Sequence, residues 1–190
     1  TVQVKGIINN STIDPNKILP MRYLWARQHY KDGVANNWTP EEVSMQKDVE
    51  QWKSTTCLSE TERRMILWNL GFFATAESLT ANNLVLTVYR FVTNPECRQY
   101  LLRQAFEEAL HTHAYQHVIE SLGMDEAEVF NMYREVPSVA RKAAWSIPFT
   151  RSLGDKNFKT GTPENDQRLL RALIAFYVVF EGLFFYLGFT

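Results

Sequence analysis

Apolar residues recur at helical spacing along most of this sequence, and the breaks between the apolar runs carry helix-capping signals. The segment Thr39–Glu42 combines an N-cap threonine, a proline at the first helical position and a capping-box glutamate. The segment Ser59–Glu62 is a second capping box, and the run after it keeps helical periodicity to about Arg90, with Gly71 as its only breaker. This pattern predicts two helix starts and one long helix in the first half of the chain.

The second half carries the same kind of signals. A second long helix is predicted over residues 95–121, because Asn94 can cap its start and Gly123 stops it. Asp125 can cap a shorter helix, and a proline opens a further helix that is predicted over residues 136–152. The capping signals therefore divide this region into three helices.

The remaining residues complete a bundle. Residues 154–161 are polar and rich in turn formers, so we expect a loop or a small hairpin there. Thr162-Pro163 then caps a last helical segment that runs to the end of the sequence. Long helices with short connections predict an all-α antiparallel bundle. Because there is no internal repeat and no low-complexity linker, we expect a single domain over residues 1–190.

Composition excludes some classes of function. With 190 residues, of which 45% are hydrophobic, the chain can build a proper core. A net charge of −1 without a basic block argues against a nucleic-acid surface. Cys57 and Cys97 have no metal-motif neighbours, so we expect two buried thiols in a reducing cytoplasm. Residues 1–17 lack the apolar core of a signal peptide.

One segment has the length of a membrane span. Between Ala172 and Thr190 there is a single charged residue, Glu181. A carboxylate in the middle of a membrane-spanning helix is costly and is normally functional. Since nothing upstream resembles a membrane protein, we expect this segment to be a buried helix of the bundle, with no membrane partner.

Glu108 and His111 are the first candidates for chemistry, because they are three residues apart on the second long helix. Their Cβ atoms are then about 5–6 Å apart on one face, so both side chains can bind the same metal ion. The spacing alone is weak evidence, since it also occurs on many solvated helices. His113 and His117 are rotated away from His111, and we expect them at the surface or at an interface.

Two further carboxylates lie in apolar runs. Glu77 and Glu181 each stand in the apolar centre of a different predicted helix. A buried carboxylate without a partner costs several kcal/mol, or it must shift its pKa and become neutral. A divalent ion shared among several carboxylates removes this cost. Together with Glu108 and His111, these residues predict a metal site in the core of a helical bundle.

This ordered set resembles the small subunit of class I ribonucleotide reductases, over essentially the whole sequence. The metal site of that family takes an Asp or Glu from one helix, a Glu-x-x-His from the next, a lone Glu from a third, and a second Glu-x-x-His from a fourth. Glu77, Glu108, His111 and Glu181 match the first four of these six ligands in order. Most members have aspartate where Glu77 stands. The resemblance implies a ferritin-like bundle with two iron ions or a manganese-containing pair.

Further residues match the family outside the ligand set. Tyr115, four residues after His111, matches the tyrosine that bears the radical. Phe185 and Phe189 follow Glu181 by four and eight residues and resemble the phenylalanines that surround that tyrosine. Trp38 matches the tryptophan that relays an electron between the metal site and the large subunit. Each of these aromatic residues alone would be an ordinary core or capping residue.

The resemblance implies a radical-generating role. Oxygen would oxidise the metal pair, Tyr115 would lose one electron, and the oxidising equivalent would pass through Trp38 to a cysteine of a separate large subunit, where ribonucleotides are reduced. It also implies a homodimer built on the long helices, and a cytoplasmic protein. The second Glu-x-x-His is expected beyond Thr190 or on a partner chain, so these residues match the N-terminal part of the family.

Two alternatives remain open at this point. Another ferritin-like di-iron carboxylate protein, either an oxidase of an organic substrate or an iron store, would share the four ligands. A helical interaction module with buried acids and no catalysis would share only the fold. The sequence contains no phosphate-binding glycine loop, no nucleophile elbow and no Cys-x-x-Cys, which argues against other classes of enzyme.

Overall fold

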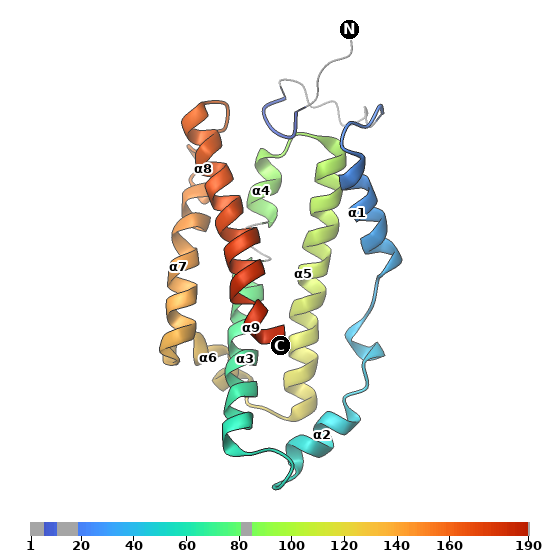
Figure 1. Ribbon diagram of the computed structural model, residues 1–190, viewed down its shortest axis with the longest axis vertical. Helices are drawn as coiled ribbons and strands as arrows, with labels where there is room; N and C mark the ends of the chain where they lie inside the picture. The colour runs from blue at the N-terminus through green and yellow to red at the C-terminus, as the bar shows by residue number, and fades with distance from the viewer. Residues whose placement is uncertain (1–5, 11–18, 81–84, 190) are drawn as a thin grey trace.

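A computed structural model describes residues 6–10, 19–80 and 85–189 of the chain, which fold as a bundle of helices (Figure 1). The helices are α1 (Leu24–Ala35), the 3₁₀-helix η1 (Pro40–Glu42), α2 (Gln46–Lys53), α3 (Glu60–Thr80), α4 (Leu86–Phe91), α5 (Pro95–Leu122), α6 (Glu126–Glu135), α7 (Pro137–Gly154), α8 (Pro163–Ile174), the π-helix η3 (Ala175–Phe184) and α9 (Tyr186–Phe189). The described ranges contain no strand other than an isolated bridge between Ile8 and Val92. The predicted all-α class is confirmed.

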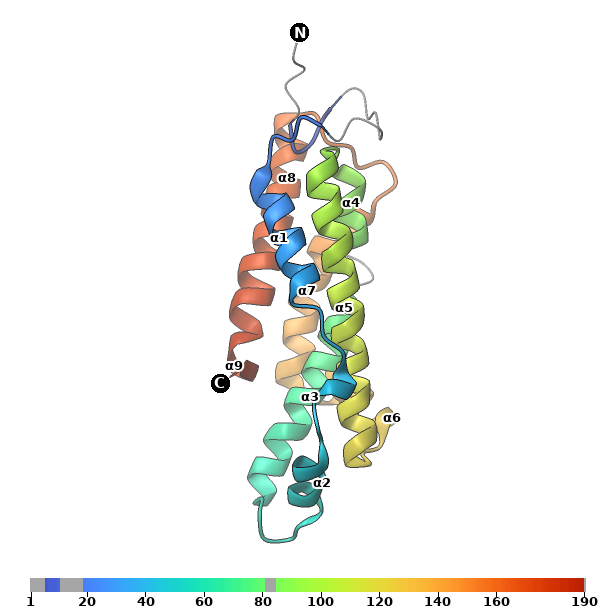
Figure 2. The same ribbon diagram turned by 90° about the vertical axis from the view of Figure 1, so that its right-hand side faces the viewer.

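Helix α5 is the longest helix of the described chain and packs against both α1 and α3. Its 28 residues span about 42 Å at the usual rise per residue. The Asn94 side chain accepts a hydrogen bond from the Cys97 amide at 2.9 Å, and Gly123 ends the helix with a φ of +66°. In Figure 2, α1 and the segment that leads to α2 run down alongside α5. The predicted bounds of this helix are confirmed.

Other predicted bounds need correction. The capping box at Thr39–Glu42 starts only the three-residue helix η1, after which Val43 is extended. The run predicted to continue to Arg90 is described as two helices, α3 and α4, with residues 81–84 outside the described ranges. The residue pattern does not predict α1, and it places a helix start at Thr39 rather than at Gln46, where α2 begins.

The last helical segment differs from the predicted α-helix in its winding. From Ala175 to Phe184 it is a π-helix, and the Phe185 amide donates to the carbonyl of Phe180, five residues earlier, at 3.3 Å. The spacing of four residues from Glu181 to Phe185 therefore does not describe one face of an α-helix. Among the described helices, none combines the length and the apolar character needed to cross a membrane.

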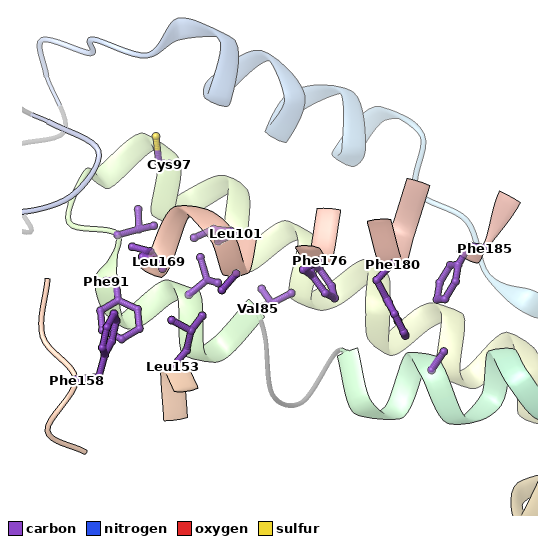
Figure 3. Packing of buried hydrophobic residues seen from close by; sticks show 14 of the residues in the cluster. Val85, Phe91, Cys97, Leu101, Leu153, Phe158, Leu169, Phe176, Phe180 and Phe185 are labelled. Atoms are coloured by element: carbon purple, nitrogen blue, oxygen red, sulfur yellow. The ribbon is translucent and has the colours of Figure 1, made fainter. Parts of the chain in front are cut away.

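Aromatic side chains dominate the core. Figure 3 shows buried residues in a row along the bundle, with Phe91 and Phe158 near one end and Phe176, Phe180 and Phe185 toward the other. These rings pack edge-on, tilted or stacked against one another; for example, Phe91 and Phe158 have ring centroids 5.2 Å apart at 82°, whereas those of Phe176 and Phe180 are 6.1 Å apart at 17°. The row joins η3 to the helices that face it.

The cysteines differ in their exposure. Both are free thiols, and Cys97 is buried at the start of α5 as predicted. Cys57 is exposed, which corrects the expectation of two buried thiols. It lies in the connection between α2 and α3, and such connections run over the surface of a protein, outside its core.

Glu96 fixes the start of α1 from a distance. Its Oε1 accepts hydrogen bonds from the amides of Arg22 at 2.7 Å and Tyr23 at 3.0 Å, just before α1 begins. Burial opposes the ionised form, but hydrogen bonds from these amides and from the amide of Glu96 itself outweigh it, and the pKa of Glu96 lies below its ordinary value of 4.5. A side chain of α5 thus provides the hydrogen-bond acceptor at the start of α1.

Glu96→Gln is therefore expected to destabilise the fold by about 1–2 kcal/mol at pH 7, because the amides lose a charged acceptor. A pKa that folding lowers stabilises the fold above the unfolded value, and this stabilisation is lost as the pH falls through 4.5 toward the lower folded value. Urea unfolding at pH 7 and pH 4 measures the difference between wild type and variant. A difference that is as large at pH 4 as at pH 7 would contradict this role.

Candidate metal centre

Glu108 and His111 lie together on α5, with the carboxylate of Glu108 buried and the imidazole of His111 partly exposed. The Glu108 side chain is 8% exposed, and its Oε2 is 3.4 Å from Nδ1 of His111, whose side chain is 40% exposed. The spacing of three residues on a continuous helix brings the two groups together, as the sequence predicts. The neighbouring Glu107 is directed elsewhere, since its carboxylate forms an ion pair with Arg103.

A hydrogen-bonded pair of residues connects Glu108 to η3. The phenol of Tyr177 donates to Oε1 of Gln104 at 2.8 Å, and the amide nitrogen of Gln104 donates to Oε1 of Glu108 at 3.4 Å. Gln104 lies one helical turn before Glu108 on α5, whereas Tyr177 comes from η3. The bonds therefore hold the two elements together at the carboxylate.

Glu181 lies four residues after Tyr177 on the same helix, η3. Its side chain is half-buried, and its Oε1 is shielded from solvent. Burial raises the pKa of Tyr177 most, the hydrogen bond to Gln104 opposes this, and smaller effects of Tyr100, Glu108 and Glu181 raise the pKa further. Burial, followed by the charge of Glu108, also raises the pKa of Tyr100. Two carboxylates from different helices thus act on one buried phenol.

Glu77, the fourth predicted ligand, belongs to another helix than Glu108, His111 and Glu181. Glu77 lies on α3, but its side chain is outside the described residues. Among the side chains that are described, no three His, Cys, Asp or Glu are grouped closely enough to hold a metal ion. The described residues therefore bring together Glu108 and His111, and they place Glu181 on η3, which the hydrogen bonds of Gln104 connect to Glu108.

Tyr115 packs into an aromatic cluster on the α3 side of α5. Its ring stacks on that of Phe73, with centroids 5.4 Å apart and planes at 6°. Phe185 contacts the same Phe73 ring edge-on, with centroids 5.2 Å apart at 80°. Phe185 is buried, as expected of a residue that shields Tyr115, and Phe73 lies between the two. The side chain of Phe189, on α9, is outside the described residues.

Trp38 is half-buried in the segment between α1 and α2, which contacts α5 on both sides of this residue. On one side of it, Oδ1 of Asn37 accepts from both terminal nitrogens of Arg103, at 3.0 and 3.1 Å. On the other side, Oε1 of Glu41 is 3.2 Å from Nε2 of His113, whose side chain is 50% exposed. The two anchoring positions on α5 flank Glu108 and His111 in the sequence. Trp38 is therefore tied to the helix that carries these two residues.

Sequence reasoning missed three residues of this region, which are Phe73, Gln104 and Tyr177. Each stands four residues before a predicted ligand, at Glu77, Glu108 and Glu181 respectively. That spacing is a signal that could have identified them as neighbours of the site. Carboxylates and an imidazole that face a helical interior are donors that hard first-row divalent ions accept, so the residues fit such a metal.

Comparisons with known proteins agree with this chemistry. A family model described as "Ribonucleotide reductase, small chain" matches residues 15–190. The chain is 50% identical over 189 residues to the ribonucleoside-diphosphate reductase subunit beta of Chlamydia pneumoniae, covering 100% of this chain and 54% of that protein. It is 33% identical over 171 residues to the human ribonucleoside-diphosphate reductase subunit M2, covering 88% of this chain and 40% of that protein.

A solved structure shares the fold. The R2 subunit of ribonucleotide reductase from Clostridium botulinum superposes with a TM-score of 0.83 at 23% identity, covering 97% of this chain and 55% of that one. This similarity confirms the predicted ferritin-like bundle. The chain spans about half the length of the relatives that it matches.

Proposed function

Because the chain belongs to the family of ribonucleotide reductase small chains, we propose that it is the radical-generating part of a class I ribonucleoside-diphosphate reductase. The observation that carries the proposal is the buried carboxylate of Glu108, whose Oε2 lies 3.4 Å from Nδ1 of His111 on a helix of the bundle. Carboxylates and an imidazole on the helices of a bundle are the donors of a di-metal carboxylate site.

Glu77, Glu108, His111 and Glu181 would hold two metal ions, as iron, manganese or a mixed pair. When bound, the pair would supply oxygen-dependent one-electron oxidation. The burial of Glu108 supports this role, because a carboxylate in the interior is costly until a cation offsets its charge. The remaining ligands would come from residues outside this sequence.

Tyr115 would give up one electron and its phenolic proton and hold the resulting radical. Its stacking on Phe73, with Phe185 behind, supports this role, since apolar rings keep water and reductants away from an oxidised phenol. We expect Phe189 to extend the same cluster. Trp38 would relay the oxidising equivalent, which its attachment to α5 supports.

The proposed partners are a separate large subunit, which would reduce the ribonucleotide, and a second copy of this chain. Leu102 and Phe106 on α5 are 54% and 47% exposed and lie one turn apart, which supports a homodimer built on this helix. A cytoplasmic location is part of the proposal, and the free thiols of Cys57 and Cys97 are consistent with a reducing compartment. We also propose that the residues form one domain.

Tyr115→Phe tests the function. After the metal-free protein is loaded with ferrous iron and exposed to oxygen, the wild type is expected to show a tyrosyl radical by electron paramagnetic resonance. The variant is expected to lose that signal completely while keeping the same iron content, because only the oxidisable hydroxyl is removed. Tyr100→Phe, on the same helix, is the control and is expected to keep the radical.

The two alternatives are separate outcomes. If Tyr115→Phe leaves the activity of an intact metal site unchanged, the protein is another ferritin-like carboxylate oxidase or an iron-binding protein. If the wild type takes up neither iron nor manganese in stoichiometric amounts, it is a helical interaction module without this chemistry.

A further inference from the structure

Gln104 lies between a buried phenol and a buried carboxylate. Tyr177 Oη donates to its Oε1 at 2.8 Å, and its Nε2 donates to Oε1 of Glu108 at 3.4 Å. The connection crosses from η3 to α5, over a separation of 73 residues in the sequence. Neither Gln104 nor Tyr177 is a ligand in the proposed function.

The carboxylate determines the direction of both hydrogen bonds. An ionised carboxylate can only accept, so Gln104 must turn its amide nitrogen toward Glu108. This leaves the amide oxygen facing η3, where the hydroxyl of Tyr177 donates to it. With the amide reversed, two acceptors would face each other at Glu108. Tyr177 therefore stabilises the amide in the orientation that the carboxylate requires.

The two oxygens of Glu108 have different surroundings. Oε1 accepts from Gln104, whereas Oε2 is 3.4 Å from Nδ1 of His111. A carboxylate that is held at one oxygen cannot rotate freely about its terminal torsion, which is otherwise broad. The oxygen that remains on the side of the imidazole is Oε2.

We propose that Gln104 and Tyr177 are positioning residues that hold Glu108 so that its Oε2, beside His111, is directed toward a divalent metal ion. This inference rests on the proposed function, since it needs Glu108 to be a metal ligand. Groups that hydrogen-bond to metal ligands orient them, and their loss typically lowers metal affinity about 10–100-fold. Tyr177 acts only through Gln104.

Manganese affinity of the full chain tests the proposal without any activity assay. Mn²⁺ is titrated into the metal-free protein, and free Mn²⁺ is followed by electron paramagnetic resonance. Tyr177→Phe is expected to weaken binding about 10-fold, and Gln104→Met by at least as much. The double variant is expected to be no weaker than Gln104→Met, because the hydrogen bonds from Tyr177 reach Glu108 through Gln104. Tyr89→Phe, at a half-buried tyrosine on α4, is expected to bind as the wild type does.

The outcomes separate this inference from the proposed function. A wild type that does not bind Mn²⁺ overturns the proposed function, and with it this inference. A wild type that binds, together with an unchanged Tyr177→Phe, overturns the positioning role alone. Additive losses in the double variant overturn the route through Gln104. If Gln104→Met does not fold, as circular dichroism would reveal, Tyr177→Phe still decides, because it removes a single oxygen atom.

Discussion

Glu108→Gln is expected to lower the affinity for Mn²⁺ or Fe²⁺ at least 100-fold, yet to leave the metal-free protein as stable as the wild type or more stable. Removing a group that only hydrogen-bonds to a metal ligand lowers metal affinity by up to about 100-fold. Removing a ligand itself should lower the affinity by at least as much. The gain in stability follows because an ionised carboxylate is costly to bury. An amide of the same shape can still bond to Gln104 but carries no charge.

The matched control is the adjacent residue. Glu107→Gln removes the same charge from the same helix, but this carboxylate pairs with Arg103, so metal affinity should stay that of the wild type. Isothermal titration measures the affinities, and thermal unfolding in a chelator measures the metal-free stabilities. Equal losses of affinity in both variants would contradict the assignment. A much lower melting temperature for metal-free Glu108→Gln would mean that the carboxylate has a structural role.

Local capping chemistry explains why much of the fold could be predicted from sequence. Asn94, Asp125 and Thr162 each accept a hydrogen bond from an amide three residues later, at the starts of α5, α6 and α8. Each signal lies within four consecutive residues, so the sequence alone contains it. The starts of these helices were therefore predictable.

The start of helix α1 has no local capping signal in the sequence. No side chain of its own caps its start at Tyr23, and the capping group is Glu96, which lies 73 residues later in the sequence. The π-helix η3 is a similar case, because the residue pattern predicts an ordinary α-helix there, and its Phe180 and Phe184 pack against Phe72 of α3 and Trp145 of α7. Both features involve residues that are far apart in the sequence.

The candidate site divides in the same way. The pair of Glu108 and His111 follows from spacing on one helix, and the structure brings them together. The partners of this pair come from other helices: Tyr177 meets Gln104 across 73 residues, and Phe73 stacks on Tyr115 from α3. Sequence patterns identify which residues carry the chemistry, while the groups that orient and shield them depend on packing.

Gly188→Ala is expected to disturb the surroundings of Tyr115 from a distance. A Cβ at this position would lie 2.0 Å from Cζ and 2.2 Å from Cε2 of Phe73, well inside contact distance. The Phe73 ring cannot move aside freely, because it is stacked on Tyr115 and packed edge-on against Phe185. Overpacking of this kind costs about 1–3 kcal/mol. Calorimetry should therefore show a melting temperature lower by about 2–10 °C.

The same variant should shorten the lifetime of a radical on Tyr115, since the ring that covers this phenol is displaced. Gly182→Ala is the control, because the nearest atom to its Cβ would be the carbonyl oxygen of Tyr177 at 3.5 Å, an ordinary contact.

Phe73→Leu in the Gly188→Ala background should recover part of the lost stability, with a coupling of about 0.5–3 kcal/mol, because the shorter side chain leaves room for the methyl group. Strictly additive effects of the two substitutions would mean that Gly188 and Phe73 do not meet. A recovered melting temperature without a recovered radical lifetime would separate the two roles of Phe73, since leucine fills the space beside Gly188 but provides no ring to stack on Tyr115.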